Sequence, residues 1–197
     1  MSRFKLGLTG SIGMGKSTTA GFFAKAGIAV WDADAAVHRL YAAGGAGAEA
    51  IGRDWPQVLV AGAVDRSALK QIIAADPTAL PRIEALVHPL VAADREAFLT
   101  SAQSDIVVLD IPLLFEKGTE KDMDATLLVT APPEVQRARV LARPGITTAQ
   151  FEAILARQMP DREKRARATH IIETLSLASV SACVTALIDH IRGQADA

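Results

Sequence analysis

Short apolar runs alternate with longer segments of helical periodicity along this chain. Such alternation is typical of a mostly parallel sheet that is covered by helices on both faces. We therefore expect an α/β fold of three layers with a five-stranded, mostly parallel sheet. The runs that predict its strands are Phe4–Thr9, Ile28–Trp31, Ile106–Leu109, Ala125–Val129 and Thr169–Ile172.

The stretch between the second and third predicted strands is far longer than one crossover helix requires. It predicts an inserted helical lobe at residues 35–104, within which helical periodicity recurs at 66–73 and 83–87. Pro89 should kink or break the second of these helices just after His88. His88 would then lie beside disrupted backbone, where contact with a substrate and a structural hydrogen bond are both open roles.

A glycine-rich loop follows the first predicted strand and has the pattern G-x-x-x-x-G-K-S at residues 10–17. In this pattern backbone N–H groups point at phosphates, a lysine reaches the outer phosphates and a hydroxyl binds magnesium. A helix predicted at 18–26, with Gly27 as its C-terminal stop, would place the phosphates at a helix N-terminus. The pattern predicts a phosphate-loop fold, and the alternative is a turn that binds nothing. Residues expected to bind the nucleotide are Gly13, Met14, Gly15, Lys16, Ser17 and Thr18, with Ser17 also a metal ligand.

Carboxylates follow two of the predicted strands, at the edge of the sheet where ligands bind in open α/β folds. Asp34 is the candidate base, since phosphoryl transfer to an alcohol uses a carboxylate that orients and deprotonates the hydroxyl. Asp32 has two open roles, as an outer-sphere partner of magnesium or as the N-cap of the following helix. Asp110 is predicted to hold or orient a magnesium-bound water opposite Ser17, and its alternative is a loop-capping acid.

Basic residues are concentrated in the range Arg137–Arg167, which contains eight of the 21 lysines and arginines. An arginine-rich helical lid at residues 143–168 is expected to close over a triphosphate and exclude water. Arg139 and Arg143 follow the fourth strand and are expected to face the site, Arg143 as a nucleotide-binding residue. For Arg162–Arg167 we expect a solvated helix face.

The composition of the chain limits the number of domains and the kinds of partner that we expect. With 197 residues, half of them hydrophobic, the chain suits one domain with a sizeable core. A net charge of -1 gives no general attraction to nucleic acid or to membranes. We find no secretory segment and no apolar run long enough to span a membrane, so we expect a soluble, cytoplasmic protein. Cys183 is expected to be a packed core thiol, and His170 and His190 to be isolated structural residues.

Together, these motifs resemble the dephospho-coenzyme A kinases, which belong to the nucleoside-monophosphate-kinase-like group of phosphate-loop proteins. The resemblance covers most of the chain. The loop alone is shared by many ATPases and GTPases, whereas its combination with the other motifs is specific. Those motifs are Asp32-Ala33-Asp34, His88-Pro89, Pro112-Leu113-Leu114-Phe115-Glu116, and Arg157-Gln158 before a basic helix.

The resemblance implies transfer of the terminal phosphate of ATP to the ribose 3′-hydroxyl of dephospho-coenzyme A, the last step of coenzyme A synthesis. ATP with Mg²⁺ would be the donor, and the inserted lobe corresponds to the coenzyme-A-binding domain of the family. On this basis Thr9, Asp34 and Arg139 correspond to catalytic positions of the family. Lys16 of the loop is also expected to be catalytic, and Asp32 and His88 are expected to bind the substrate.

The chain departs from the family after the last predicted strand. The family usually has Ala-Asp, two apolar residues and Asp-Asn-x-Gly there, whereas this chain reads Thr-His-Ile-Ile-Glu-Thr-Leu-Ser at 169–176. That loop borders the adenine of ATP in the family, and here we expect it to contact adenine mainly through backbone atoms. Two other functions stay open, a kinase of another small alcohol or nucleotide and a nucleotide-binding regulator without turnover. A GTPase switch is disfavoured because the chain has no Asn-Lys-x-Asp signature. The sequence does not indicate an oligomeric state.

Overall fold

The computed structural model describes residues 3–195 of the chain. The chain divides into two compact units. The sheet unit combines residues 1–31 with 103–197, and the helical unit comprises residues 32–102. The bounds of the helical unit lie close to those expected for the inserted lobe. No helix in the described part of the chain has the length and apolar character needed to cross a bilayer.

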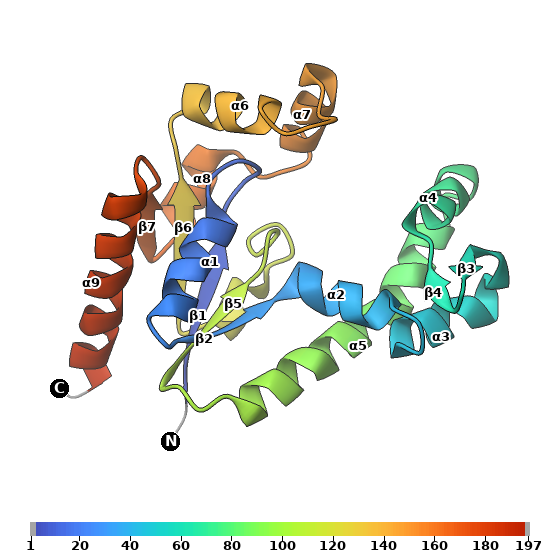
Figure 1. The fold of residues 1–197 in the computed structure, drawn as a ribbon, viewed down its shortest axis with the longest axis horizontal. Coiled ribbons are helices and arrows are strands. Elements are labelled where there is room, and N and C mark those ends of the chain that lie inside the picture. Colours follow the sequence, from blue (N-terminus) through green and yellow to red (C-terminus); the bar gives the residue numbers. More distant parts are fainter. Residues whose placement is uncertain (1–2, 196–197) are drawn as a thin grey trace. The chain divides into compact units, whose positions relative to one another are not determined.

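The sheet unit is built on a five-stranded sheet with the order β2-β5-β1-β6-β7 (Figure 1). β1 pairs in parallel with both β5 and β6, and β6 pairs in parallel with β7. Every residue of β5 and β6 is buried, which explains why both are mainly apolar runs in the sequence. The predicted α/β fold with five strands is confirmed. The strands are β1 (Phe4–Thr9), β2 (Ala29–Asp32), β5 (Ile106–Asp110), β6 (Ala125–Thr130) and β7 (His170–Glu173).

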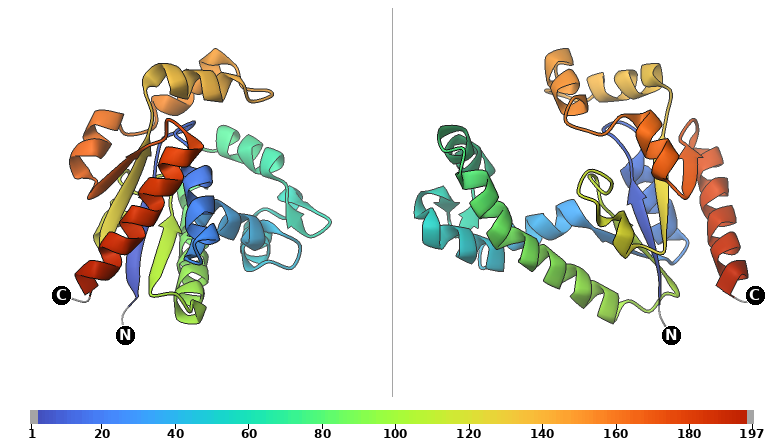
Figure 2. Two further views of the ribbon diagram at one scale, coloured as in Figure 1. Left: turned by 60° about the vertical axis from the view of Figure 1, so that its left-hand side comes forward. Right: turned by 180° about the vertical axis from the view of Figure 1, so that it is seen from behind.

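Helices cover this sheet. α1 and α9 lie side by side against one face (Figure 2), where Phe23 of α1 and Val184 of α9 share a core with Leu8 of β1. The opposite face meets the segment that follows β5: a Cβ added at Gly7 would lie 2.9 Å from Met123 Cγ. The helices of the unit are α1 (Lys16–Lys25), α6 (Pro133–Leu141), α7 (Thr148–Leu155), α8 (Asp161–Arg167) and α9 (Leu177–Ala195), with a 3-10 turn at Thr119–Asp122.

Two expectations about single residues near α9 are wrong. Cys183 is exposed, because the buried stripe of α9 runs through Val180 and Val184 and leaves the thiol beside it. His170 of β7 and His190 of α9 are not isolated, since their rings meet edge to face with centroids 5.9 Å apart. Burial, together with the neighbouring His190, lowers the pKa of His170.

The helical unit has an apolar core of its own, which includes Ile51, Trp55 and Val87. It also contains a hairpin that the sequence did not predict, in which β3 (Leu59–Val60) pairs antiparallel with β4 (Ala63–Val64). Strands of two residues are too short to show an alternating pattern. The helices of the unit are α2 (Ala33–Tyr41), α3 (Ala46–Asp54), α4 (Arg66–Ala75) and α5 (Ala79–Ser101), with a 3-10 turn at Pro56–Val58.

α5 continues through Pro89, so one alternative of the prediction, a break after His88, is wrong, and the other, a kink, stays a prediction. A proline inside a helix removes one backbone hydrogen bond and costs about 3 kcal/mol. Burial on both sides of the proline offsets this cost, because Val87 belongs to the core of the helical unit and Val91 packs against it. His88 therefore lies on a continuous helix. Its side chain is exposed, and Nε2 is 3.9 Å from Glu84 Oε1.

Candidate active site

The glycine-rich loop joins β1 to α1 and contains two residues in the left-handed backbone region. Gly13 has φ 78° and Gly15 has φ 86°, values that favour glycine. Both are also tightly surrounded: a Cβ at Gly13 would lie 2.5 Å from Val140 Cγ2, and one at Gly15 would lie 3.1 Å from Thr174 Oγ1. The loop thus passes close to α6 and to the segment after β7, and glycine is required at both points.

α1 begins directly after this loop, with Gly15 as its N-cap and Lys16 as its first residue. The first N–H groups of a helix have no partner within the helix, and the helix dipole favours an anion beside them. Met14 anchors the loop, since its buried Sδ accepts a hydrogen bond from Ala131 N at 3.0 Å. The loop therefore offers backbone donors to an anion while its side chains fix it to the end of β6.

Lys16 and Asp110 form an ion pair between Nζ and Oδ1, with the carboxylate buried. The strand order explains the contact, because Asp110 ends β5 directly opposite Leu8 of β1, and the loop follows β1. The sequence placed Lys16 at the phosphates and Asp110 at the metal, and it did not predict that the two side chains meet.

Thr9 ends β1 and is completely buried. Its hydroxyl donates a hydrogen bond to the carbonyl of Pro112 at 3.2 Å. One residue earlier, the carbonyl of Leu8 accepts a hydrogen bond from Ile111 N at 2.9 Å. The end of β1 is therefore tied to the segment that carries Asp110. The catalytic role of Thr9 stays a prediction.

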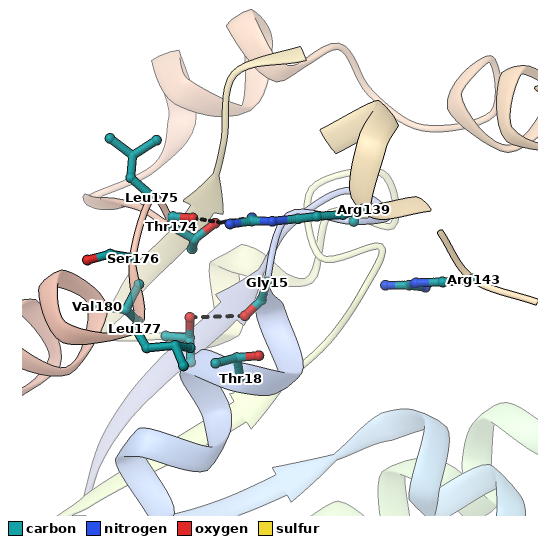
Figure 3. A pocket seen from close by; sticks show the side chains of 11 residues that line it. Gly15, Thr18, Arg139, Arg143, Thr174, Leu175, Ser176, Leu177 and Val180 are labelled. Carbon is teal, nitrogen blue, oxygen red and sulfur yellow. Dashed lines mark hydrogen bonds between the residues drawn. The ribbon is translucent and has the colours of Figure 1, made fainter. Parts of the chain in front are cut away.

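A cavity of about 350 Å³ lies beside the loop (Figure 3). It has the size of a small-molecule site. Three parts of the sheet unit form its wall: the loop with the start of α1, the arginines that follow β6, and the segment after β7. The structure thus places Arg139 and Arg143 in one cavity with the loop, and their roles at the nucleotide stay predictions. The lining residues are Gly13, Gly15, Thr18, Thr19, Arg139, Arg143, Thr174, Leu175, Ser176, Leu177 and Val180.

Arg139 is held by a single residue of that wall. Its Nη1 donates to Thr174 Oγ1 at 2.8 Å and its Nη2 donates to the Thr174 carbonyl at 2.5 Å (Figure 3). In the sequence, Thr174 stands out only as part of a loop that departs from the family. The available signal was its position, because it stands where the family's pattern has asparagine.

The range Arg162–Arg167 is only in part the solvated helix face that we expected, since Arg162 and Arg167 are exposed and Lys164 is not. Lys164 is completely buried and its Nζ lies 2.8 Å from Glu116 Oε1. Glu116 also accepts a hydrogen bond from Met159 N at 2.9 Å, which ties α8 to the segment after β5. Burial opposes ionisation of Glu116, but the interactions with Lys164 and Met159 outweigh it and hold its pKa below the usual value. Arg165 is engaged too, with Asp161 and Glu173.

The remaining candidates belong to the helical unit. The Asp32 carboxylate accepts a hydrogen bond from Ala35 N at 2.9 Å, so the capping alternative for this residue is confirmed. Asp34 lies exposed in the first turn of α2 and lines a hollow of about 240 Å³. His88 does not line this hollow, whose other residues are Val37, Tyr41, Arg66, Leu69, Lys70 and Ile73.

This hollow lies between the facing sides of α2 and α4. Two cations one turn apart on α4, Arg66 and Lys70, share it with Asp34. The guanidinium of Arg66 lies 5.9 Å from the centroid of the Tyr41 ring. Burial raises the pKa of Tyr41 and Arg66 opposes the rise, so the phenol stays protonated at neutral pH. Sequence reasoning missed this hollow, although the spacing of Arg66 and Lys70 on a predicted helix was a usable signal.

The chain is similar to known proteins over nearly its whole length. The family model for dephospho-CoA kinase matches residues 4–178. A dephospho-CoA kinase from Cereibacter sphaeroides is 71% identical over 197 residues, which are 100% of each chain. A dephospho-CoA kinase from Ruegeria pomeroyi is 57% identical over 189 residues and covers 96% of each chain.

Solved structures share the fold. The crystal structure of TT1252 from Thermus thermophilus has a TM-score of 0.85 and 38% identity, over 96% of this chain and 98% of that one. A dephospho-CoA kinase from Campylobacter jejuni has a TM-score of 0.65 and 21% identity, over 97% of this chain and 98% of that one. The second likeness is one of fold alone.

Proposed function

Because the chain belongs to the dephospho-CoA kinase family, we propose that it transfers the terminal phosphate of ATP to the ribose 3′-hydroxyl of dephospho-coenzyme A. The products are coenzyme A and ADP. The observation that carries this proposal is the cavity in which the glycine-rich loop meets Arg139 and Arg143. A site of this kind supplies positioning and positive charge, which is most of what phosphoryl transfer requires from a protein.

The donor side of the reaction is assigned to the sheet unit. Backbone N–H groups of the loop and of the start of α1 would bind the phosphates of ATP. Lys16 would reach the outer phosphates, with Asp110 holding its ammonium group in place. Arg139 and Arg143 would neutralise charge on the phosphoryl group as its bond to the leaving ADP oxygen breaks.

Ser17 and Asp110 have the donor chemistry that suits Mg²⁺, since a hydroxyl and a carboxylate are hard oxygen ligands. Asp110 fits this role because its carboxylate is buried at the end of β5, next to the loop that ends in Ser17. These two residues would hold the ion. A bound Mg²⁺ would shield the negative charge of the triphosphate.

The acceptor side is assigned to the helical unit, with Asp34 as the base. Its carboxylate would take the proton of the 3′-hydroxyl as the oxygen forms its new bond to phosphorus. The hollow beside Asp34 supports this role, because Arg66 and Lys70 can bind the diphosphate of the acceptor. Thr9, Asp32 and His88 stay predictions as further site residues.

The direct test measures ADP release by the full chain with ATP and Mg²⁺, using dephospho-coenzyme A or adenosine monophosphate as the acceptor. We expect release that depends on dephospho-coenzyme A. Faster release with adenosine monophosphate would favour a kinase of another acceptor. ATP binding without release in the presence of either acceptor would favour the regulator without turnover.

A further inference from the structure

We propose that Thr174 is a positioning residue, which fixes the guanidinium of Arg139 in the wall of the phosphate-loop cavity. The inference rests on the proposed function, in which Arg139 acts on the transferring phosphoryl group. Thr174 itself would contact neither the phosphoryl group nor the acceptor, and it would act through the arginine.

The guanidinium is bound at two points of one residue. Nη1 of Arg139 is 2.8 Å from Thr174 Oγ1, and Nη2 is 2.5 Å from the Thr174 carbonyl. Two bonds from the rigid fork of a guanidinium fix both its place and its plane. Figure 3 shows the arginine side chain extending from α6 to this residue, with both groups in the cavity wall.

The direction of each hydrogen bond follows from chemistry. Arginine has donors only, so the Thr174 hydroxyl must accept from it. The single proton of the hydroxyl is then left for a backbone carbonyl, and two are in reach: Met14 O at 3.0 Å and Thr130 O at 3.3 Å. One oxygen atom of Thr174 therefore contacts the guanidinium of Arg139 and lies within hydrogen-bond distance of backbone carbonyls in the loop and at the end of β6.

Thr174 is well placed to hold another group because it is itself fixed. It is only 5% exposed, and its N–H donates to the Thr130 carbonyl at 2.8 Å. This bond extends the pairing of β6 with β7 by one residue. Its side chain also packs against the loop, since a Cβ at Gly15 would meet three of its atoms within 3.2 Å. The end of the sheet, the loop and the arginine therefore share one contact residue.

This arrangement matters because a free arginine side chain loses rotamer entropy when it is ordered. The loss is a free-energy cost, and for long side chains such as arginine it is among the largest of any residue. A guanidinium that is already held before the reaction avoids this cost at the transition state. Removal of the Thr174 hydroxyl should therefore reduce turnover more than nucleotide affinity.

The experiment compares Thr174→Val, Thr174→Ser and wild type by kcat and by KM for ATP. Valine keeps the shape of the side chain and lacks the hydroxyl, so kcat should fall roughly tenfold or more, as for a lost hydrogen bond to a charged group. Serine restores the hydroxyl and should restore kcat. In an Arg139→Ala background, Thr174→Val should cause no further loss, because a residue that acts through the arginine has nothing left to position.

The matched control is Thr185→Val on the exposed side of α9, whose hydroxyl bonds only to the Ser181 carbonyl among the contacts described. It should leave kcat unchanged. If Thr174→Val does not fold by circular dichroism, Thr174→Ala takes its place in the same cycle. The proposal would be overturned if the Thr174 variant had an unchanged or raised kcat. It would also be overturned if that variant lowered kcat equally in the wild-type and Arg139→Ala backgrounds. A wild-type enzyme that does not use dephospho-coenzyme A would instead overturn the proposed function.

Discussion

Lys16 and Asp110 form an ion pair that joins the first residue of α1 to the last residue of β5, and the Asp110 side chain is only 1% exposed. A buried ion pair is costly to break because the group left behind stays away from water. The same lysine is assigned to the phosphates of ATP. Lys16 therefore contributes both to the stability of the folded state and to the proposed reaction.

Replacement of Lys16 by alanine should damage both properties. Nucleotide affinity and turnover should fall together, since the ammonium group meets phosphate in the ground state and in the transition state. The free energy of unfolding should fall by about 3 kcal/mol, because Asp110 stays buried without its lysine. ATP titration and urea unfolding measure the two effects.

The double variant Lys16→Ala with Asp110→Asn separates the effect on stability from the effect on activity. It removes the buried charge and should recover part of the lost stability, whereas activity should stay low. A double variant that is less stable than Lys16→Ala alone would contradict this account of the pair.

Replacement of Asp34 by asparagine should lower kcat by roughly 10²- to 10⁴-fold, the usual contribution of a positioned base. The affinity for ATP should change little, because the amide keeps the shape of the side chain and Asp34 belongs to the helical unit. Single-turnover kinetics with dephospho-coenzyme A and an ATP titration provide the two numbers. Unchanged turnover would remove Asp34 from the role of base.

The sheet could be predicted from the sequence because burial on both faces makes its strands continuous apolar runs. β5 and β6 are buried at every residue, and each was predicted to within one residue at its end. Single positions at the margin of a pattern were harder. Cys183 is next to the buried stripe of α9 but outside it, and Pro89 is tolerated because neighbouring residues of α5 are packed in a core.

The site could be predicted only as a set of chemical groups. The glycine pattern identified the loop, and the position of Arg139 after a strand suggested that it faces a ligand. Which groups meet depends on strand order, and strand order is a tertiary property. The pairs of Lys16 with Asp110 and of Arg139 with Thr174 join segments that are far apart in the chain, so no local pattern could reveal them.

Arg66 and Lys70 line the hollow of the helical unit, and we predict that both bind the acceptor. The variant Arg66→Ala with Lys70→Ala should raise KM for dephospho-coenzyme A roughly tenfold or more, because charged hydrogen bonds to a diphosphate are lost. Both kcat and KM for ATP should change little. Initial rates at varied acceptor concentration provide the measurement. Arg53→Ala, an exposed arginine of α3 outside the hollow, is the matched control, and an equal effect of this variant would contradict a specific site.

The ion pair between Glu116 and Lys164 should make the stability of the folded protein depend on pH. The pKa of Glu116 is lowered from 4.5 in the folded protein, so the unfolded chain binds more protons on acidification. The contribution of Glu116 is therefore present well above the unfolded pKa of 4.5 and is lost as the pH falls from there through the lower pKa of the folded state. Glu116→Gln leaves Lys164 buried without a carboxylate partner at 2.8 Å and should cost about 3 kcal/mol at neutral pH. Urea unfolding from pH 7 to about pH 3 should show that the difference in free energy of unfolding between wild type and Glu116→Gln becomes smaller as the pH falls.

The control is the exposed Glu163→Gln on α8, which should leave the dependence of stability on pH unchanged. A difference between wild type and Glu116→Gln that persists at all pH values would show that the charge on Glu116 is not its cause.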